Sequence, residues 1–344
     1  CLVKILISMC VMRTINLAEI TLGMEGRAKE KSRYRRVQKF FKEVIFNYDE
    51  IARRILNWFF SDKPLYLALD RTNWKWGKQG INILVLSVIY KGVAIPILWK
   101  VLNKNGCTSP PERMDIVQRF INIFGVKRIT GLVADREFVG KEWFRLLVYK
   151  NIPFFIRIKD NIIATGNNRK KLKIKQLFKD IKPGEKLVIA ERYTIYNRDL
   201  YIAGARSLTG DLMVVASNVK SEEAIEIYLK RWQIETLFGY LKSKGFRFED
   251  THMTDGAKIE KVMALLSIGF CWALKTGEWR NEARERIKLK KHNRPEKSIF
   301  RHGLDFLREA ILKISRKGDL FKICIRLFFI PPNFDIKMAS GGVL

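Results

Sequence analysis

The sequence predicts an α/β protein with a mixed sheet at its centre, and three observations support this fold class. Residues 1–60 carry apolar side chains at helical spacing, whereas beyond Pro64 short β-branched runs alternate with helical stretches. The elements after Pro64 follow the order β-β-β-α-β-α-β, a three-stranded meander followed by two crossover units. The 344 residues, 47% of them hydrophobic, suffice for a sizeable core and for two domains.

The elements of the central region follow from local patterns. Tyr90-Lys91-Gly92 predicts a tight turn between two strands, and Pro110-Pro111 ends the extended chain. The predicted elements are, in order, strands at 65–69, 81–89 and 93–101, a helix at 112–124, a strand at 129–134, a helix at 141–150 and a strand at 153–158. Together they form the first part of the core, residues 61–159.

The rest of the chain divides into four further segments. Because the chain opens on Cys1 and not on Met, we expect its natural start to lie upstream. Ser221 is expected to cap one long helix that runs to Lys242. The segments are a basic helical N-terminal segment (1–60), a β-rich insertion (160–220), the second part of the core (221–278) and a basic helical tail (279–344). Small basic helical domains commonly bind DNA, so we expect residues 1–60 to be a DNA-binding segment; the alternative is a helical cap with a solvated charged face.

The charge balance points to a polyanionic partner. Lys and Arg number 65 and Asp and Glu 35, which gives a net charge of +30 spread along the whole chain. Nucleic acid is the simplest explanation. An anionic membrane face, a solubility device and association with ribosomes are the alternatives.

Cysteines and hydropathy indicate the compartment. The five cysteines are an odd number without a CxxC pair, and the three histidines do not cluster, so neither a disulfide framework nor a zinc site is expected. The apolar run Val262 to Leu274 is too short for a membrane span and predicts a buried helix. We therefore expect a protein of the reducing cytoplasm.

Two aspartates occupy positions suited to chemistry. Asp70 and Asp135 each follow an apolar strand. If these strands are parallel neighbours, both carboxylates project into one crevice at the end of the sheet. Two close carboxylates repel each other, and a divalent cation with oxygen ligands, Mg²⁺ or Mn²⁺, relieves that repulsion. The alternative is that each aspartate is a turn or helix-capping residue.

A third acid lies on the long predicted helix. At about 100° per residue, Tyr228, Arg231, Glu235 and Lys242 share a stripe about 60° wide. Such a stripe suits a metal-bound phosphodiester, with Glu235 on the metal and the other three side chains on phosphate oxygens. The alternative is an exposed helix with an ordinary Arg231–Glu235 pair.

Three motifs in this order resemble those of a known family. Tyr228-x2-Arg231-x3-Glu235-x6-Lys242 resembles the signature of bacterial insertion-sequence DDE transposases of the IS-four family. Leu69-Asp-Arg-Thr-Asn-Trp74 and Asp135-Arg-Glu-Phe138 resemble the first-Asp and second-Asp motifs of that family. The resemblance covers roughly residues 25–315 and leaves room for a β-rich insertion between Asp135 and Glu235.

The resemblance implies a function and a mechanism. The core is expected to be ribonuclease-H-like, with Asp70, Asp135 and Glu235 binding two divalent ions, Mg²⁺ or Mn²⁺. The enzyme is expected to cleave DNA at the inverted repeats that end a transposable element, and then to join the freed 3′-hydroxyl to target DNA as a homodimer. Some members pass through a DNA hairpin with a flipped base stacked on tryptophan. The DNA contacts are expected to be Tyr228, Arg231, Trp232 and Lys242.

The roles of several further residues have alternative interpretations, and two other functions are compatible with the sequence. Glu137 invites assignment as the third acid, but we favour a turn or supporting role two residues after Asp135. Trp74 and Trp76 have two interpretations, base stacking and packing on the hairpin, and His252 is expected to be a structural loop residue. A nuclease of the same fold that never joins ends, and a non-catalytic DNA-binding remnant, are the alternative functions.

Overall fold

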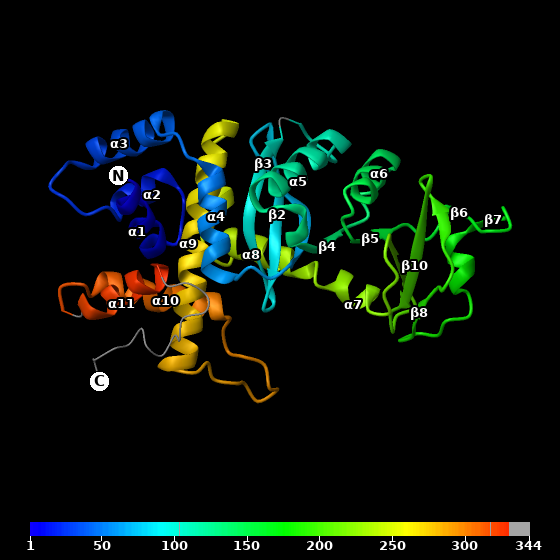
Figure 1. Ribbon diagram of the computed structural model, residues 1–344. Coiled ribbons are helices and arrows are strands. Elements are labelled where there is room, and N and C mark those ends of the chain that lie inside the picture. The colour runs from blue at the N-terminus through cyan, green and yellow to red at the C-terminus, as the bar shows by residue number, and fades with distance from the viewer. Residues whose placement is uncertain (103, 317, 330–344) are drawn as a thin grey trace. The chain divides into compact units, whose positions relative to one another are not determined.

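The computed structural model describes residues 1–102, 104–316 and 318–329 (Figure 1). The chain forms two compact units. The helical unit contains Cys1–Ser61, Trp74–Ile81 and Leu237–Leu344, and the sheet unit contains Asp62–Asn73 and Asn82–Thr236. Of the predicted basic tail 279–344, residues 330–344 lie outside the described part of the chain.

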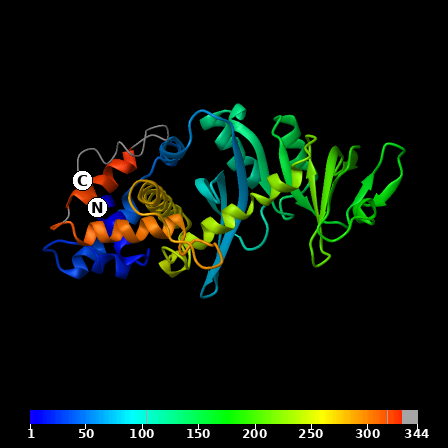
Figure 2. The same ribbon diagram turned by 90° about the horizontal axis from the view of Figure 1, so that it is seen from below.

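The helical unit is built around one long helix, α9 (Gly256–Ala283). Figure 2 looks nearly along this helix and shows other helices around it. Its neighbours are α1 (Leu2–Met12), α3 (Glu30–Glu43), α4 (Tyr48–Phe59), α10 (Ile299–Leu312) and α11 (Gly318–Phe329), while α2 (Leu17–Leu22) packs on α1 and α3. The helical prediction for residues 1–60 is confirmed, as is the buried helix over 262–274. Within the described residues, no helix is both long and apolar enough to cross a membrane.

The sheet unit carries most of an eleven-stranded sheet with the order β3-β2-β1-β4-β5-β11-β10-β9-β6-β7, in which β8 pairs with β10. Strands β1, β4 and β5 are parallel, whereas β2 and β3, and β5 and β11, are antiparallel. The strands are β1 (Leu65–Trp76), β2 (Gln79–Tyr90), β3 (Val93–Leu102), β4 (Ile129–Ala134), β5 (Phe154–Ile158), β6 (Ile163–Thr165), β7 (Lys171–Lys173), β8 (Lys186–Val188), β9 (Tyr193–Ile195), β10 (Arg198–Arg206) and β11 (Leu212–Ser217).

Helices cover the parallel part of this sheet. Strand β4 is buried almost throughout, so side chains on both of its faces are covered. The packing helices include α5 (Pro110–Phe124), α6 (Lys141–Tyr149) and α7 (Ala224–Leu229). The predicted α/β fold class, a mixed sheet flanked by helices, is confirmed.

The prediction of the first strand needs correction. β1 does not end at Asp70 but continues to Trp76, because it forms a long hairpin with β2 through the turn at Gly77–Lys78. Asp70 therefore lies within a strand, one residue beyond the last pairing of β1 with β4. Residues 160–220 are rich in strands, and two of these, β10 and β11, extend the central sheet from β5.

The predicted single helix from Ser221 to Lys242 is also wrong, because it is interrupted. α7 ends at Leu229 and α8 (Trp232–Leu241) begins three residues later. At the break Arg231 N–H donates to Tyr228 O at 2.9 Å, and Ile234 N–H donates to Arg231 O at 3.0 Å. These are i to i−3 bonds, which tighten the chain into a 3₁₀ turn. Arg231 therefore lies at a bend and not on a regular helix face.

Candidate active site

Asp70, within β1, and Asp135, directly after β4, lie at the same level of two neighbouring strands. The last paired residues of β1 and β4 are Leu69 and Ala134, and the two aspartates follow them directly. The strands are parallel, so the prediction that both carboxylates lie at one end of the sheet holds in the structure. The Asp70 side chain is only 15% exposed.

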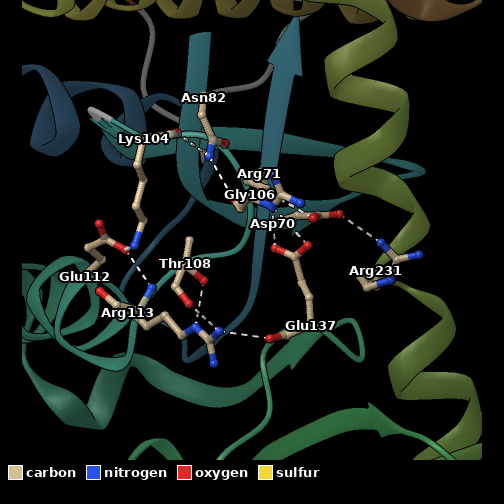
Figure 3. Close-up of polar contacts among 11 residues, drawn as sticks. Asp70, Arg71, Asn82, Lys104, Gly106, Thr108, Glu112, Arg113, Glu137 and Arg231 are labelled. Carbon is tan, nitrogen blue, oxygen red and sulfur yellow. Dashed lines mark hydrogen bonds and ion pairs between the residues drawn. The ribbon is translucent and has the colours of Figure 1, made fainter. Parts of the chain in front are cut away.

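Arg231 connects the first and third predicted acids. Its Nη1 donates to Asp70 Oδ2 at 2.9 Å, and its Nη2 donates to Glu235 Oε1 at 2.8 Å (Figure 3 shows the contact with Asp70). The Arg231 side chain is 5% exposed, and its buried Nε has no hydrogen-bond partner among the described residues. The Arg231 guanidinium thus connects Asp70 on β1 with Glu235 on α8, and its Nε–H makes no hydrogen bond to the described residues.

Tyr228 forms a hydrogen bond with Asp135. Its hydroxyl donates to Asp135 Oδ1 at 3.3 Å, and the residue is 1% exposed. Burial raises the pKa of this phenol above its ordinary value. It therefore remains a neutral donor near neutral pH and orients Asp135.

Asp70 lies close to two other acids, Asp135 and Glu137. Burial raises the pKa of Asp70 from 3.8 to about 6. The negative charges of Glu137 and Asp135 act in the same direction, whereas Arg231 and the N–H of Arg71 lower it. Burial opposes the charge of Arg231, but Tyr228 and the acids around it raise the pKa of Arg231 above its ordinary value. A cation is thus strongly favoured beside Asp70.

A second arginine pair, which the sequence did not indicate, borders the aspartates. Arg71 Nε donates to both carboxylate oxygens of Glu137, at 2.7 and 2.9 Å (Figure 3). The expectation that Glu137 supports the site agrees with this contact. The role of Arg113 was also missed, because nothing in a helical pattern marks an arginine that turns inward to bind backbone oxygens.

The carboxylates match a divalent cation only in part. Asp70 and Asp135 are oxygen donors on adjacent strands, as Mg²⁺ and Mn²⁺ require. Glu235 is instead held by Arg231. Within the described residues no three His, Cys, Asp or Glu side chains form a group that could hold a metal ion. In this conformation Arg231 supplies the positive charge between two of the acids.

The other expected DNA contacts lie in different surroundings. Trp232 is 55% exposed and has the Arg231 guanidinium 5.2 Å from its ring. Lys242 belongs to the helical unit, where it pairs with Glu249 at 2.7 Å and lies over the Trp74 ring.

Two aromatic residues that the sequence left open also lie in the helical unit. Trp74 is buried and packs against Phe248, which follows α8 and lies outside the β1–β2 hairpin. Trp76 is exposed and stacks on His252, with centroids 3.9 Å apart.

Comparison with known proteins decides the family. Residues 62–272 match the family model described as the transposase DDE domain, which is more than half of the chain. The chain belongs to this family. It is therefore a DDE transposase, which moves DNA by cut-and-paste transposition and uses divalent metal ions to cleave and join phosphodiester bonds.

No curated protein matches the transposase. Among solved structures, the cryo-EM structure of a piggyBac transposase synaptic complex with hairpin DNA is similar with a TM-score of 0.49 and 10% identity, over 97% of this chain and 77% of that chain.

Proposed function

We propose that this transposase is a member of the IS-four family in which Asp70, Asp135 and Glu235 are the catalytic acids. The observation that carries the proposal is the pair of aspartates at equal level on adjacent parallel strands, with Glu235 joined to Asp70 through one guanidinium. A fold alone would not support a site, but three acids around one buried arginine do.

The chain's own groups have distinct tasks in this proposal. Asp70 and Asp135 would hold divalent ions, Mg²⁺ or Mn²⁺, and Glu235 would join them when Arg231 moves away. When bound, two such ions supply activation of water or of a 3′-hydroxyl, and stabilise the leaving oxygen. Tyr228 keeps Asp135 oriented through its hydroxyl. The Arg231 Nε is a buried donor with no partner in the described part of the chain, which suits a phosphate oxygen of DNA.

The proposed partners are the terminal inverted repeats of an element and target DNA. The net charge of +30 supports a polyanion. Trp232, exposed beside Arg231, is proposed to stack on DNA, and Lys242 to exchange Glu249 for a phosphate. We propose that a homodimer brings two ends together, because transposition joins both. The five cysteines are free, in agreement with a reducing cytoplasm.

A cleavage assay tests the assignment of the third acid. Labelled terminal-repeat DNA is incubated with Mg²⁺ and either wild type, Glu235→Gln or Glu222→Gln. Glu222 is an exposed acid before α7, so its variant is a matched control. We expect Glu235→Gln to bind DNA but to lose cleavage at least about a hundredfold, as catalytic groups do, and Glu222→Gln to behave as wild type. Persisting cleavage by Glu235→Gln would refute the role of Glu235.

A further inference from the structure

The loop that carries Asp135 lies beyond the end of a strand. Pairing of β4 with β1 ends at Leu69 and Ala134, and β4 itself ends at Ala134. At the turn, Phe138 N–H donates to Asp135 O at 2.9 Å. The spacing between Asp70 and Asp135 therefore depends on side chains beyond the sheet.

Arg71 and Glu137 connect strand β1 with the loop that follows β4. Arg71 directly follows Asp70 and donates from its backbone N–H to Asp70 Oδ1 at 2.8 Å. Its Nε reaches both oxygens of Glu137, and the two side chains are only 18% and 21% exposed. A charge-assisted bond with little solvent around it is worth more than an exposed ion pair. One residue thus contacts the first aspartate and the loop of the second.

Arg113 of α5 holds the same loop from the other side. It is 4% exposed, and its Nη2 and Nη1 donate to the backbone oxygens of Glu137 and Val139, at 2.9 and 3.1 Å. It also donates to the hydroxyl and backbone oxygen of Thr108, both at 2.7 Å (Figure 3). Its guanidinium lies over the ring of Phe138. Residues 137–139 are thereby fixed to a loop and a helix of the same unit.

We propose that Arg71 and Glu137 are positioning residues that set the spacing of Asp70 and Asp135, and that Arg113 fixes the loop on which Glu137 lies. Glu137 is thus not the third catalytic acid, because both of its carboxylate oxygens are paired with Arg71. Arg71 in turn is kept from pairing with either aspartate. This inference rests on the proposed catalytic role of those aspartates.

The test compares Glu137→Gln, Arg71→Gln and the double variant with wild type. Glu142→Gln is the matched control, because Glu142 forms an exposed pair with Arg145 on α6. We expect each single variant to lower the single-turnover cleavage rate at least about tenfold at an unchanged Kd for DNA, and the control to have no effect. The loss in the double variant should be at least about fivefold smaller than the product of the single losses, because the pair acts as a unit.

Hydrogen exchange provides a readout that does not depend on cleavage. We expect faster exchange of the backbone amides of 135–139 in Glu137→Gln, and unchanged exchange elsewhere and in Glu142→Gln. The positioning role would be overturned by unchanged exchange in this loop. It would also be overturned if the loss of cleavage rate in the double variant equalled the product of the two single losses. If residues 135–139 exchange faster in Glu137→Gln but wild type does not cleave DNA, the proposed function is refuted and the positioning role stands.

Discussion

Arg231 donates a hydrogen bond of 2.9 Å from its Nη1 to Oδ2 of Asp70, and through its other terminal nitrogen it also holds Glu235. Two of the three acids proposed to hold divalent ions are thus bound to a side-chain cation. Arg231 and a metal ion compete for the same oxygens. A DNA phosphate that attracts Arg231 would therefore make the acids available at the moment when DNA is bound.

Removal of the Arg231 charge should raise metal affinity in the absence of DNA. A hydrogen bond to a charged group contributes about 1.5 kcal/mol or more, so Arg231→Gln should bind Mn²⁺ roughly tenfold more tightly, measured by calorimetry. Its affinity for terminal DNA should fall. Arg145→Gln, which removes an exposed arginine of α6, is the control and should change neither affinity. Equal or weaker Mn²⁺ binding by Arg231→Gln would contradict the competition.

The protonation of Asp70 should appear in the pH dependence of stability. Its folded pKa of about 6 exceeds its ordinary value of 3.8, so the folded state binds this proton more tightly. The resulting stability is complete below the ordinary pKa and is lost as pH rises through about 6. The shift corresponds to roughly 3 kcal/mol. In metal-free protein, urea unfolding should show that the stability of wild type relative to Asp70→Asn falls by about this amount from pH 4 to pH 7. A constant difference would exclude the raised pKa.

The crossing of α9 and α10 should not tolerate a methyl group. A Cβ on Gly303 would lie 1.8 Å from the Ala273 carbonyl oxygen and 2.4 Å from the Gly277 nitrogen. Backbone cannot yield as a flexible side chain does, so Gly303→Ala should lower the free energy of unfolding by about 3 kcal/mol or more. Gly239→Ala is the control, since the nearest atom to its Cβ would be 3.5 Å away. Thermal unfolding measures both, and equal midpoints would show that the helices separate readily.

Binding to DNA should be strongly salt-dependent. With a net charge of +30, affinity is expected to depend largely on the release of counterions from phosphates. If about six phosphates are contacted, affinity should fall roughly a thousandfold between about 50 and 200 mM salt, as measured by fluorescence anisotropy. A flat response would contradict phosphate contacts as the main source of affinity.

The sequence predicted the elements that depend on local patterns. The strand before Asp135 and the turn at Lys91–Gly92 were correctly located, because apolar runs and turn residues encode them. The end of β1 was not, because its outer part alternates polar and aromatic residues and is stabilised by the hairpin with β2. Pairing with β2 thus extends β1 beyond the apolar run from which its end was predicted.

The site was predictable in its residues but not in its contacts. Spacing placed Tyr228, Arg231 and Glu235 together, although the helix breaks at Arg231. No sequence pattern indicates that Arg231 would turn toward Asp70, 161 residues away, or that Arg113 would bind the loop after Asp135. Such contacts depend on the topology of the sheet and on burial, which only the folded chain determines.

Strand transfer tests the central claim most directly. A terminal-repeat DNA already cut to expose its 3′-hydroxyl is incubated with Mg²⁺ and a supercoiled target plasmid. We expect wild type to join this hydroxyl to the plasmid, and Asp70→Asn, Asp135→Asn and Glu235→Gln to bind the DNA without joining it. Cleavage of uncut ends without joining by wild type would indicate a nuclease of the same fold, and joining by any of the three variants would contradict the assignment of the acids.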